Sequence, residues 1–367
     1  KRDERKDIAL LVSDAPCTAA GVFTANLVKA APVLRDQAIL AGHGARVRAV
    51  LANTGSANAC TGEPGLHDAQ TSAERTAALL GCAPDEVLTL STGVIGLPLD
   101  MVAMEQGIAG LVPALRPDGW ADAAAAIMTT DTRPKLASAR LSSGAVLTGI
   151  AKGAGMIAPH MATMLALIAT DASLPSADLD RYLRVAVEES FNCIVVDGDM
   201  STNDTALLLA NGAAGLAEGD PAEFQAALTG VCIALAQAIV RDGEGATKFV
   251  TVEVGGAADE ANARRIARQI AISPLVKTAF YGADANWGRI LAAAGYAGVA
   301  LDPARLGLWL LNADGQPVMQ LVEGGQPTDY NERAAIALMQ TAEWGVRLDL
   351  GLGAARTHVW TCDLSHD

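Results

Sequence analysis

Short apolar runs alternate with longer helix-like segments in the first part of the chain. Val47–Asn53 and Glu86–Ser91 are apolar runs of strand length, and each leads into a polar turn that contains glycine, as buried strands commonly do. The segments Asp100–Leu115 and Asp118–Met128 have the length and pattern of helices. The pattern therefore predicts a sheet with helices packed on it.

The middle of the chain continues this alternation. The predicted strands are Ser138–Leu141 and Ala145–Ile150, which form a hairpin across Ser142–Gly144, and then Met164–Thr170, Ile194–Val196, Ala206–Ala210 and Lys248–Val254. The predicted helices are Leu179–Glu189, Pro221–Val240, which has proline in its first turn, and the amphipathic Asp259–Ile272. We expect Val276–Tyr281 to continue the alternation.

The C-terminal part differs, because strand-like runs now follow one another. Leu306–Leu311 and Val318–Val322 flank the turn signal Asn312–Gln316, and Val346–Leu350 and Thr357–Asp363 are further strand candidates. The predicted fold class is mixed α/β with antiparallel pieces rather than a strict βαβ repeat.

The composition agrees with this fold class. A chain of 367 residues suffices for two domains or one large α/β unit with a sizeable core. Hydrophobic residues make up 51% of the chain, many of them alanine, whereas aromatic residues make up only 4%. This balance favours helices packed closely on sheets over a β-sandwich.

The charge balance excludes one class of partner. The chain has 27 Lys and Arg against 41 Asp and Glu, a net charge of −14, whereas nucleic-acid binding depends on clustered basic residues. No nucleic-acid partner is therefore expected. An anionic small molecule needs a local basic pocket, because the field of the whole protein does not attract it.

Cysteine, histidine and hydropathy patterns exclude further classes. The six cysteines are scattered without a C-x-x-C pair, which is typical of reduced cysteines, and the five histidines lack the spacing of zinc ligands, so no metal site is expected. The longest apolar stretch, Leu228–Val240, is interrupted by Thr229 and Gln237 and falls short of the roughly 18 residues of a membrane span. The opening KRDERKD is a charge run rather than a signal peptide. A soluble, cytoplasmic protein with no membrane partner is expected.

Glycine-rich polar turns are the remaining candidates for chemistry. The chain lacks the phosphate-loop pattern G-x-x-x-x-G-K-[ST], a complete dinucleotide fingerprint and the G-x-S-x-G elbow of α/β-hydrolases. The turns that remain at predicted strand ends are Asn53–Gly62, Ser91–Gly96, Met128–Lys135, Gly149–Gly155, Asp197–Thr205 and Asp242–Lys248.

Residues in these turns also have ordinary structural interpretations. The Thr92 hydroxyl and the Gly93 amide can point at one spot as oxyanion donors, or Thr92 can cap a following helical turn. The segment Asn53–Gly62 is, by residue type, most often a tight turn. An isolated lysine such as Lys152 is most often a solvated surface residue, and Glu244, between glycines, an exposed turn carboxylate.

Thr163 offers a nucleophile of an unusual kind. It follows the small residue Ala162 and opens the apolar run MLALIA, so by propensity alone it starts a strand. A threonine hydroxyl is a poor nucleophile without a base, and the nearby His160 has no acid partner close in sequence. The threonine's own α-amine can act as the base, but only after the bond between Ala162 and Thr163 has been cut.

A series of longer sequence blocks runs along the chain, namely GVFTAN, VKAAPV, NTGSANACTG, STGVIG, IMTTDTRPK, KGAGMIAP, MATML, SFNCIVVDGDMSTNDT, DGEGATK, SPLVKTA and NWGRILAA. Together and in this order, these blocks closely resemble those of the ornithine acetyltransferase family of arginine biosynthesis, also called bifunctional glutamate N-acetyltransferase. The resemblance as a whole covers the chain from about Asp7 to Ser365. The resemblance implies a mixed α/β fold of the ornithine acetyltransferase and DmpA-like type, with mixed sheets sandwiched between helices.

The resemblance also implies self-processing and a set of residue roles. Cleavage between Ala162 and Thr163 gives an α chain of residues 1–162 and a β chain of residues 163–367, which opens with the nucleophile Thr163. The residues carried over by motif are Thr92 and Gly93 for the oxyanion hole, and Thr129, Lys152, Thr163 and Glu244 for substrate binding. His160 stands where the family usually has asparagine, an exchange that can change the rate of processing or its response to pH.

The implied activity is transfer of acetyl from N2-acetyl-L-ornithine to L-glutamate by a ping-pong route, with no cofactor. Acetyl-CoA as a second acetyl donor stays open. The implied assembly is two α and two β chains from two precursors. Two alternatives also stay open: an N-terminal-nucleophile hydrolase or aminopeptidase that passes the acyl group to water, and a non-catalytic binding or assembly protein on the same scaffold.

Overall fold

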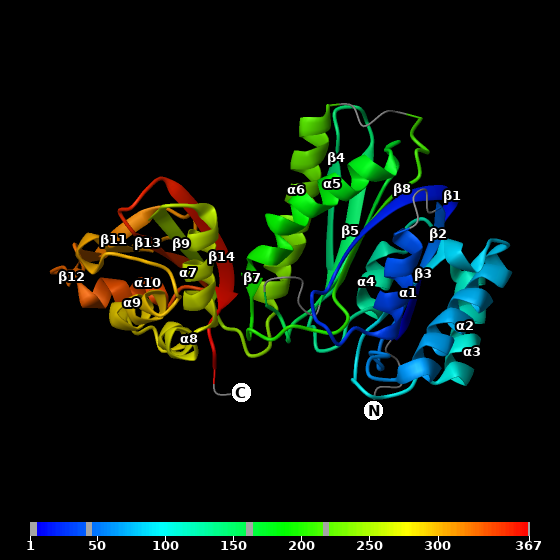
Figure 1. Ribbon diagram of the computed structural model, residues 1–367, viewed down its shortest axis with the longest axis horizontal. Coiled ribbons are helices and arrows are strands. Elements are labelled where there is room, and N and C mark those ends of the chain that lie inside the picture. Colours follow the sequence, from blue (N-terminus) through cyan, green and yellow to red (C-terminus); the bar gives the residue numbers. More distant parts are fainter. Residues whose placement is uncertain (1–5, 42–45, 159–163, 216–219, 366–367) are drawn as a thin grey trace. The chain divides into compact units, whose positions relative to one another are not determined.

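The computed structural model describes residues 6–41, 46–158, 164–215 and 220–365 (Figure 1). The chain divides into two compact units, of which the first comprises Lys1–Asn192 and Asp199–Ile239 and the second Cys193–Gly198 and Val240–Asp367. Within the described residues, each unit is built on a seven-stranded sheet.

The sheet of the first unit mixes parallel and antiparallel pairs. Its strand order is β3-β2-β1-β8-β6-β5-β4, in which β2–β3 and β6–β8 are parallel and the other neighbours antiparallel. The strands are β1 (Ile8–Phe23), β2 (Arg46–Asn53), β3 (Val87–Ser91), β4 (Lys135–Arg140), β5 (Val146–Lys152), β6 (Leu165–Thr170) and β8 (Thr205–Ala210). β6 and β8 consist almost entirely of buried apolar residues, as strands covered by helices on both faces do.

Helices cover both faces of this sheet. They are α1 (Ala31–Leu40), α2 (Gly62–Leu80), α3 (Met101–Leu111), α4 (Trp120–Ala126), α5 (Ser176–Glu188) and α6 (Pro221–Arg241). α2 and α3 contribute Ala73 and Ile108 to a core cluster that includes Leu51 of β2. α4 contributes Ala124 to a separate cluster that includes Leu165 of β6.

α6 is the one helix among the described residues that is long and apolar enough to cross a membrane by length and composition. Its buried side chains recur at helical spacing, at Phe224, Leu228, Val231 and Leu235. Val231 and Leu235 lie directly against Gly149 of β5. These are the contacts of a helix that packs on a sheet.

The sheet of the second unit has the order β12-β11-β10-β13-β9-β14-β7, with β9–β13 and β7–β14 parallel. Its strands are β7 (Ile194–Val195), β9 (Phe249–Ala257), β10 (Gly307–Leu311), β11 (Pro317–Glu323), β12 (Gln326–Pro327), β13 (Glu343–Asp349) and β14 (Ala355–Cys362), and its helices are α7 (Glu260–Ile272), α8 (Pro274–Tyr281), α9 (Trp287–Gly295) and α10 (Glu332–Met339). In its core, Phe280 of α8 meets Trp344 of β13 edge-on, with ring centroids 5.1 Å apart.

The mixed α/β class is confirmed, and so are most of the predicted elements. The hairpin predicted across Ser142–Gly144 is the pair β4–β5. Val276–Tyr281, where the alternation called for a strand, is helical instead, because Ser273 caps α8 and Pro274 opens it. β1 was not predicted, because the polar residues of VSDAP interrupt its apolar pattern.

The predicted α and β chains do not correspond to the two compact units. β6, which follows Thr163 in the sequence, pairs with β5 on one side and β8 on the other, inside the sheet of the first unit. Residues from both sides of the predicted cleavage site thus share one sheet. Cleavage itself stays a prediction, because Ala162 and Thr163 lie outside the described residues.

Candidate active site

Three of the predicted site residues meet in the first unit. Thr92 follows β3, Thr129 follows α4, and Lys152 ends β5. The Nζ atom of Lys152 donates a hydrogen bond to Oγ1 of Thr129 at 2.8 Å and to Oγ1 of Thr92 at 3.3 Å. Only 2% of Lys152 is exposed. Its interpretation as a solvated surface lysine is therefore wrong, and the residue is a buried cation between two hydroxyl groups.

Thr92 and Gly93 present two donors at one turn. An ammonium group can only donate, so the Thr92 hydroxyl that accepts from Lys152 keeps its own proton for another acceptor. The backbone N–H of Gly93 has no hydrogen-bond partner among the described residues. The helix that follows begins at Met101 and is capped by Asp100, so Thr92 is not its cap. A hydroxyl beside an unpaired amide is the donor set of an oxyanion hole.

The turn Asn53–Gly62 packs against Thr92 and Gly93, so it does more than connect two elements of the fold. Gly93 has φ +137°, and a Cβ added to it would lie 2.3 Å from the carbonyl carbon of Gly55. The backbone N–H of Thr92 donates to the Asn53 carbonyl at 3.0 Å, and the Ser91 hydroxyl donates to Oδ1 of Asn53 at 2.6 Å. Only glycine allows the two turns to approach this closely.

Asp131 joins the turn that holds Thr129 to the end of β5. Its Oδ2 accepts the backbone N–H of Thr129 at 3.0 Å, and its Oδ1 accepts the N–H of Gly153 at 2.7 Å and Nζ of Lys135 at 2.6 Å. Burial by itself raises the pKa of Asp131, but the ammonium groups of Lys152 and Lys135 and the Gly153 N–H outweigh burial and hold the pKa below its usual range. Asp131 is thus a buried carboxylate that fixes Thr129 relative to Lys152.

Replacing this carboxylate is expected to cost stability in a pH-dependent way. A carboxylate whose pKa is lowered by folding stabilises the fold above its unfolded pKa, near pH ~4, and loses that contribution as the pH falls through the lowered value. Asp131→Asn should therefore lower the free energy of unfolding by about 3 kcal/mol near neutral pH, because it removes the carboxylate charge that two buried lysines face. Urea unfolding near neutral pH and well below pH ~4 measures whether this deficit shrinks in acid.

Asp171→Asn is the matched control for this measurement. Asp171 also accepts a backbone N–H of the β5 strand, that of Val146 at 2.7 Å, but no lysine contact is recorded for it among the described residues. Its substitution should cost less stability near neutral pH than that of Asp131. A deficit for Asp131→Asn that is equally large in acid would contradict the assignment of Asp131 as an ionised partner of the lysines.

The structure does not place the remaining predicted residues relative to this cluster. Glu244 belongs to the second unit, where it is exposed in the turn between α6 and β9, so its substrate-binding role stays a prediction. Ala162, Thr163 and His160 lie outside the described residues. The nearest described neighbour of Thr163 in the sequence is Met164, and the residue after it pairs with Lys152 across β5 and β6.

Sequence reasoning missed three residues that organise the site. Asp131, Asn203 and Asp204 all lie inside blocks that were singled out, namely IMTTDTRPK and SFNCIVVDGDMSTNDT, but residue type alone did not distinguish them from turn formers. Asn203 uses its Nδ2 to donate to the carbonyls of Ala57 and Ser91, at 2.7 and 2.8 Å, and so ties together the turns that hold Gly55 and Gly93. All three are buried. Burial would have distinguished them from ordinary turn residues, but it cannot be read from the residue types.

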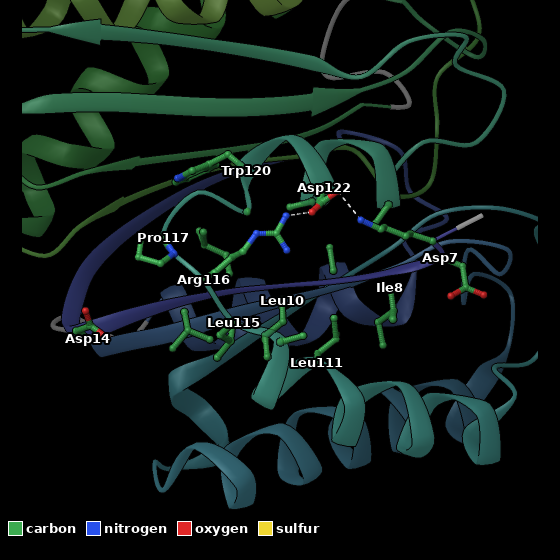
Figure 2. Close-up of a pocket in the computed structure, with 18 residues that line it drawn as sticks. Asp7, Ile8, Leu10, Asp14, Leu111, Leu115, Arg116, Pro117, Trp120 and Asp122 are labelled. Carbon is green, nitrogen blue, oxygen red and sulfur yellow. Dashed lines mark hydrogen bonds and ion pairs between the residues drawn. The ribbon is translucent and has the colours of Figure 1, made fainter. Parts of the chain in front are cut away.

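A separate groove of about 620 Å³ lies between β1 and the segment from Leu111 to Ala126 (Figure 2). Its floor is apolar, and Asp122 bonds to Arg116 and Lys6 at its rim. None of the predicted site residues that the structure describes lines it. Within the described parts of the chain, no group of three or more His, Cys, Asp or Glu side chains could hold a metal ion.

The chain matches the ArgJ family along residues 1–367. It belongs to the ArgJ family. The arginine biosynthesis bifunctional protein ArgJ of Symbiobacterium thermophilum is 48% identical over 371 residues, which cover 99% of this chain and 90% of that protein. The protein of the same name from Geobacter sulfurreducens is 49% identical over 376 residues, which cover 100% and 94%. The solved ArgJ structure from Bacillus halodurans is 38% identical, covers 54% of this chain and 92% of that one, and has a TM-score of 0.50.

Membership of the ArgJ family confirms the resemblance seen in the sequence blocks, and with it the expectation of an acyltransferase. It favours that expectation over a hydrolase or a non-catalytic protein on the same scaffold. The roles of individual residues stay predictions, and the geometry around Lys152 is the physical basis on which they can be argued.

Proposed function

We propose that this protein transfers the acetyl group of N2-acetyl-L-ornithine to L-glutamate through an acetyl ester of Thr163, and so serves arginine biosynthesis. The observation that carries the proposal is the buried Lys152 ammonium, bonded to the hydroxyls of Thr92 and Thr129. Lys152 pairs across β5 and β6 with Leu165, and Leu165 lies two positions after Thr163 in the sequence. A cation, two hydroxyls and a free amide around the start of one strand suit an acyl-transfer site for a substrate that carries a carboxylate.

The chemistry begins once the Ala162–Thr163 bond is cut. The α-amine of Thr163, with an ordinary pKa near ~8, takes the hydroxyl proton directly or through a water molecule. The hydroxyl oxygen attacks the acetyl carbonyl, and the Thr92 hydroxyl and the Gly93 N–H stabilise the tetrahedral oxyanion. One such donor typically lowers the barrier by about 3 kcal/mol. The C–N bond then breaks, and ornithine leaves with the proton on its amine. The amine of glutamate attacks the ester in turn, the C–O bond to Thr163 breaks, and the proton lost by the amine returns to the Thr163 hydroxyl as N-acetylglutamate leaves.

Substrate recognition follows from charge. Both substrates carry an α-carboxylate, which suits the Lys152 ammonium and the Thr129 hydroxyl in a chain whose net charge of −14 gives anions no general attraction. The ornithine side chain carries an ammonium group, for which Glu244 offers a carboxylate partner. This pairing rests on charge complementarity alone.

Further parts of the proposal concern co-substrates and assembly. The reaction as written needs no cofactor, and acetyl-CoA is a candidate second donor of the acetyl group to glutamate. The proposed assembly is an α2β2 heterotetramer in the cytoplasm. An N-terminal-nucleophile amidohydrolase is the alternative activity, in which water instead of glutamate takes the acetyl group from Thr163.

The test is acetyl transfer by the purified, processed protein. With N2-acetylornithine and glutamate together, ornithine and N-acetylglutamate should form in equal amounts. With N2-acetylornithine alone, ornithine release should stop after about one equivalent per site, because the acetyl ester waits for an amine. Sustained ornithine release without glutamate identifies the hydrolase instead. Glutamate with acetyl-CoA alone tests the second donor.

A further inference from the structure

Two adjacent residues before β8 reach two different parts of the candidate active site. Asn203 holds the oxyanion turn through the carbonyls of Ser91 and Ala57. Oδ1 of Asp204 accepts the backbone N–H of Met164 at 3.0 Å. The carbonyl half of that peptide unit belongs to the residue before Met164, which is Thr163. Asp204 thus fixes the backbone of Met164, the residue that directly follows the proposed nucleophile in the sequence.

Other contacts make this anchor rigid. The backbone N–H of Thr205 donates to the Met164 carbonyl at 3.0 Å, so Met164 is held at both of its backbone polar groups. The N–H of Thr24 donates to the Asp204 carbonyl at 2.9 Å, which fixes Asp204 in turn. From this point β6 and β8 run parallel, with Leu165 beside Thr205. The turn before β8 therefore sets where β6 begins relative to the oxyanion turn.

The surroundings of Asp204 are unusual for a carboxyl group. The residue is fully buried, and among the described residues its Oδ2 has no hydrogen-bond partner. Burial raises the pKa of Asp204 well above its ordinary value, and the Met164 N–H, the Thr24 side chain and the Lys152 ammonium lower it only in part. A buried polar group with an unpaired atom calls for an explanation.

We propose that Asp204 is a positioning residue, which accepts the Met164 N–H and thereby holds the nucleophile in register with the oxyanion turn that Asn203 secures. The inference rests on the proposed function of Thr163. In this role Asp204 contributes shape and one hydrogen-bond acceptor, and its negative charge is not used. An asparagine side chain has nearly the same shape as a neutral carboxyl and offers the same acceptor.

The test compares Asp204→Ala with Asp204→Asn in the full chain. Asp204→Ala should lower kcat about 100-fold with little change in KM, because a displaced nucleophile slows the chemical step more than it weakens binding. Single-turnover formation of the acetyl enzyme should slow by the same factor. Asp204→Asn should stay within about threefold of the unmutated enzyme. Rates are divided by the fraction of chain cleaved at Ala162/Thr163, so that slower processing is not counted as slower transfer.

Asp171→Ala is the matched control, because Asp171 accepts one backbone N–H, that of Val146, in the neighbouring strand pair β5–β6. It should lower stability but leave the rate of acetyl-enzyme formation unchanged. Unmutated rates in Asp204→Ala, or an Asp204→Asn enzyme slowed about 100-fold, would overturn the positioning role. The Asn variant decides the question even where the Ala variant does not fold. If Thr163 of the unmutated protein is never acetylated, the proposed function fails, whatever the Asp204 variants do.

Discussion

Thr163→Ala is expected to remain a single polypeptide and to transfer no acetyl groups. In an N-terminal-nucleophile enzyme, the same hydroxyl attacks the preceding peptide bond during processing and the substrate during turnover. The variant loses the hydroxyl for both reactions, and without cleavage it also lacks the α-amine that serves as the base. Denaturing electrophoresis should show one band where the unmutated protein shows two, and transfer should fall by about 10⁴-fold or more.

Thr163→Ser is the matched variant for this experiment. It keeps a hydroxyl and, after cleavage, an α-amine, so it should give two bands and measurable transfer. Mass spectrometry after addition of N2-acetylornithine should find one acetyl group on the N-terminal residue of the β chain in the unmutated and Ser proteins, and none in the Ala protein. Two bands for Thr163→Ala, or transfer at the unmutated rate, would remove Thr163 from the mechanism.

Local patterns were sufficient to predict the strands that end at the site. β2, β3 and β5 are short apolar runs followed by polar glycine-containing turns, and all three lie close to where the pattern places them. The oxyanion role of Thr92 and Gly93 stays a prediction, but it too needed only local chemistry, because a hydroxyl and an amide at adjacent positions share one turn. Elements with weaker patterns escaped, such as β1 with its polar VSDAP stretch.

Contacts between residues far apart in the sequence could not be predicted in the same way. Lys152 lies 60 positions from Thr92, and Asn203 lies 112 positions from Ser91, yet both pairs are hydrogen-bonded. Nothing in the residue types around Lys152 indicates that β5 carries it inward, so the usual behaviour of an isolated lysine pointed the wrong way. Asp204 is even more difficult to predict from the sequence, because it stands out only through its burial and its hydrogen bond to a backbone group far away in the sequence. The order of the seven strands in the sheet therefore brings the site residues together.

Gly93→Ala is expected to lower kcat about 100- to 1000-fold, the usual cost of losing an oxyanion donor. The added Cβ would lie 2.3 Å from the carbonyl carbon of Gly55 and 2.7 Å from the backbone nitrogen of Ser56, and backbone atoms cannot move aside as a flexible side chain can. The turn must shift, and the Gly93 N–H moves with it. The Lys152 and Thr129 contact is left intact, so KM should change much less than kcat.

Gly96→Ala separates this clash from the strain of the backbone. Gly96 lies on the same turn and also has a positive φ, +81°, but a Cβ added there meets nothing within 4 Å. Both substitutions should lower the free energy of unfolding by about 1–3 kcal/mol, because an L side chain is strained at such angles. Only Gly93→Ala should slow acetyl-enzyme formation. Equal losses of kcat in the two variants would mean that the turn tolerates no strain anywhere, and the Gly93 amide would lose its assignment as an oxyanion donor.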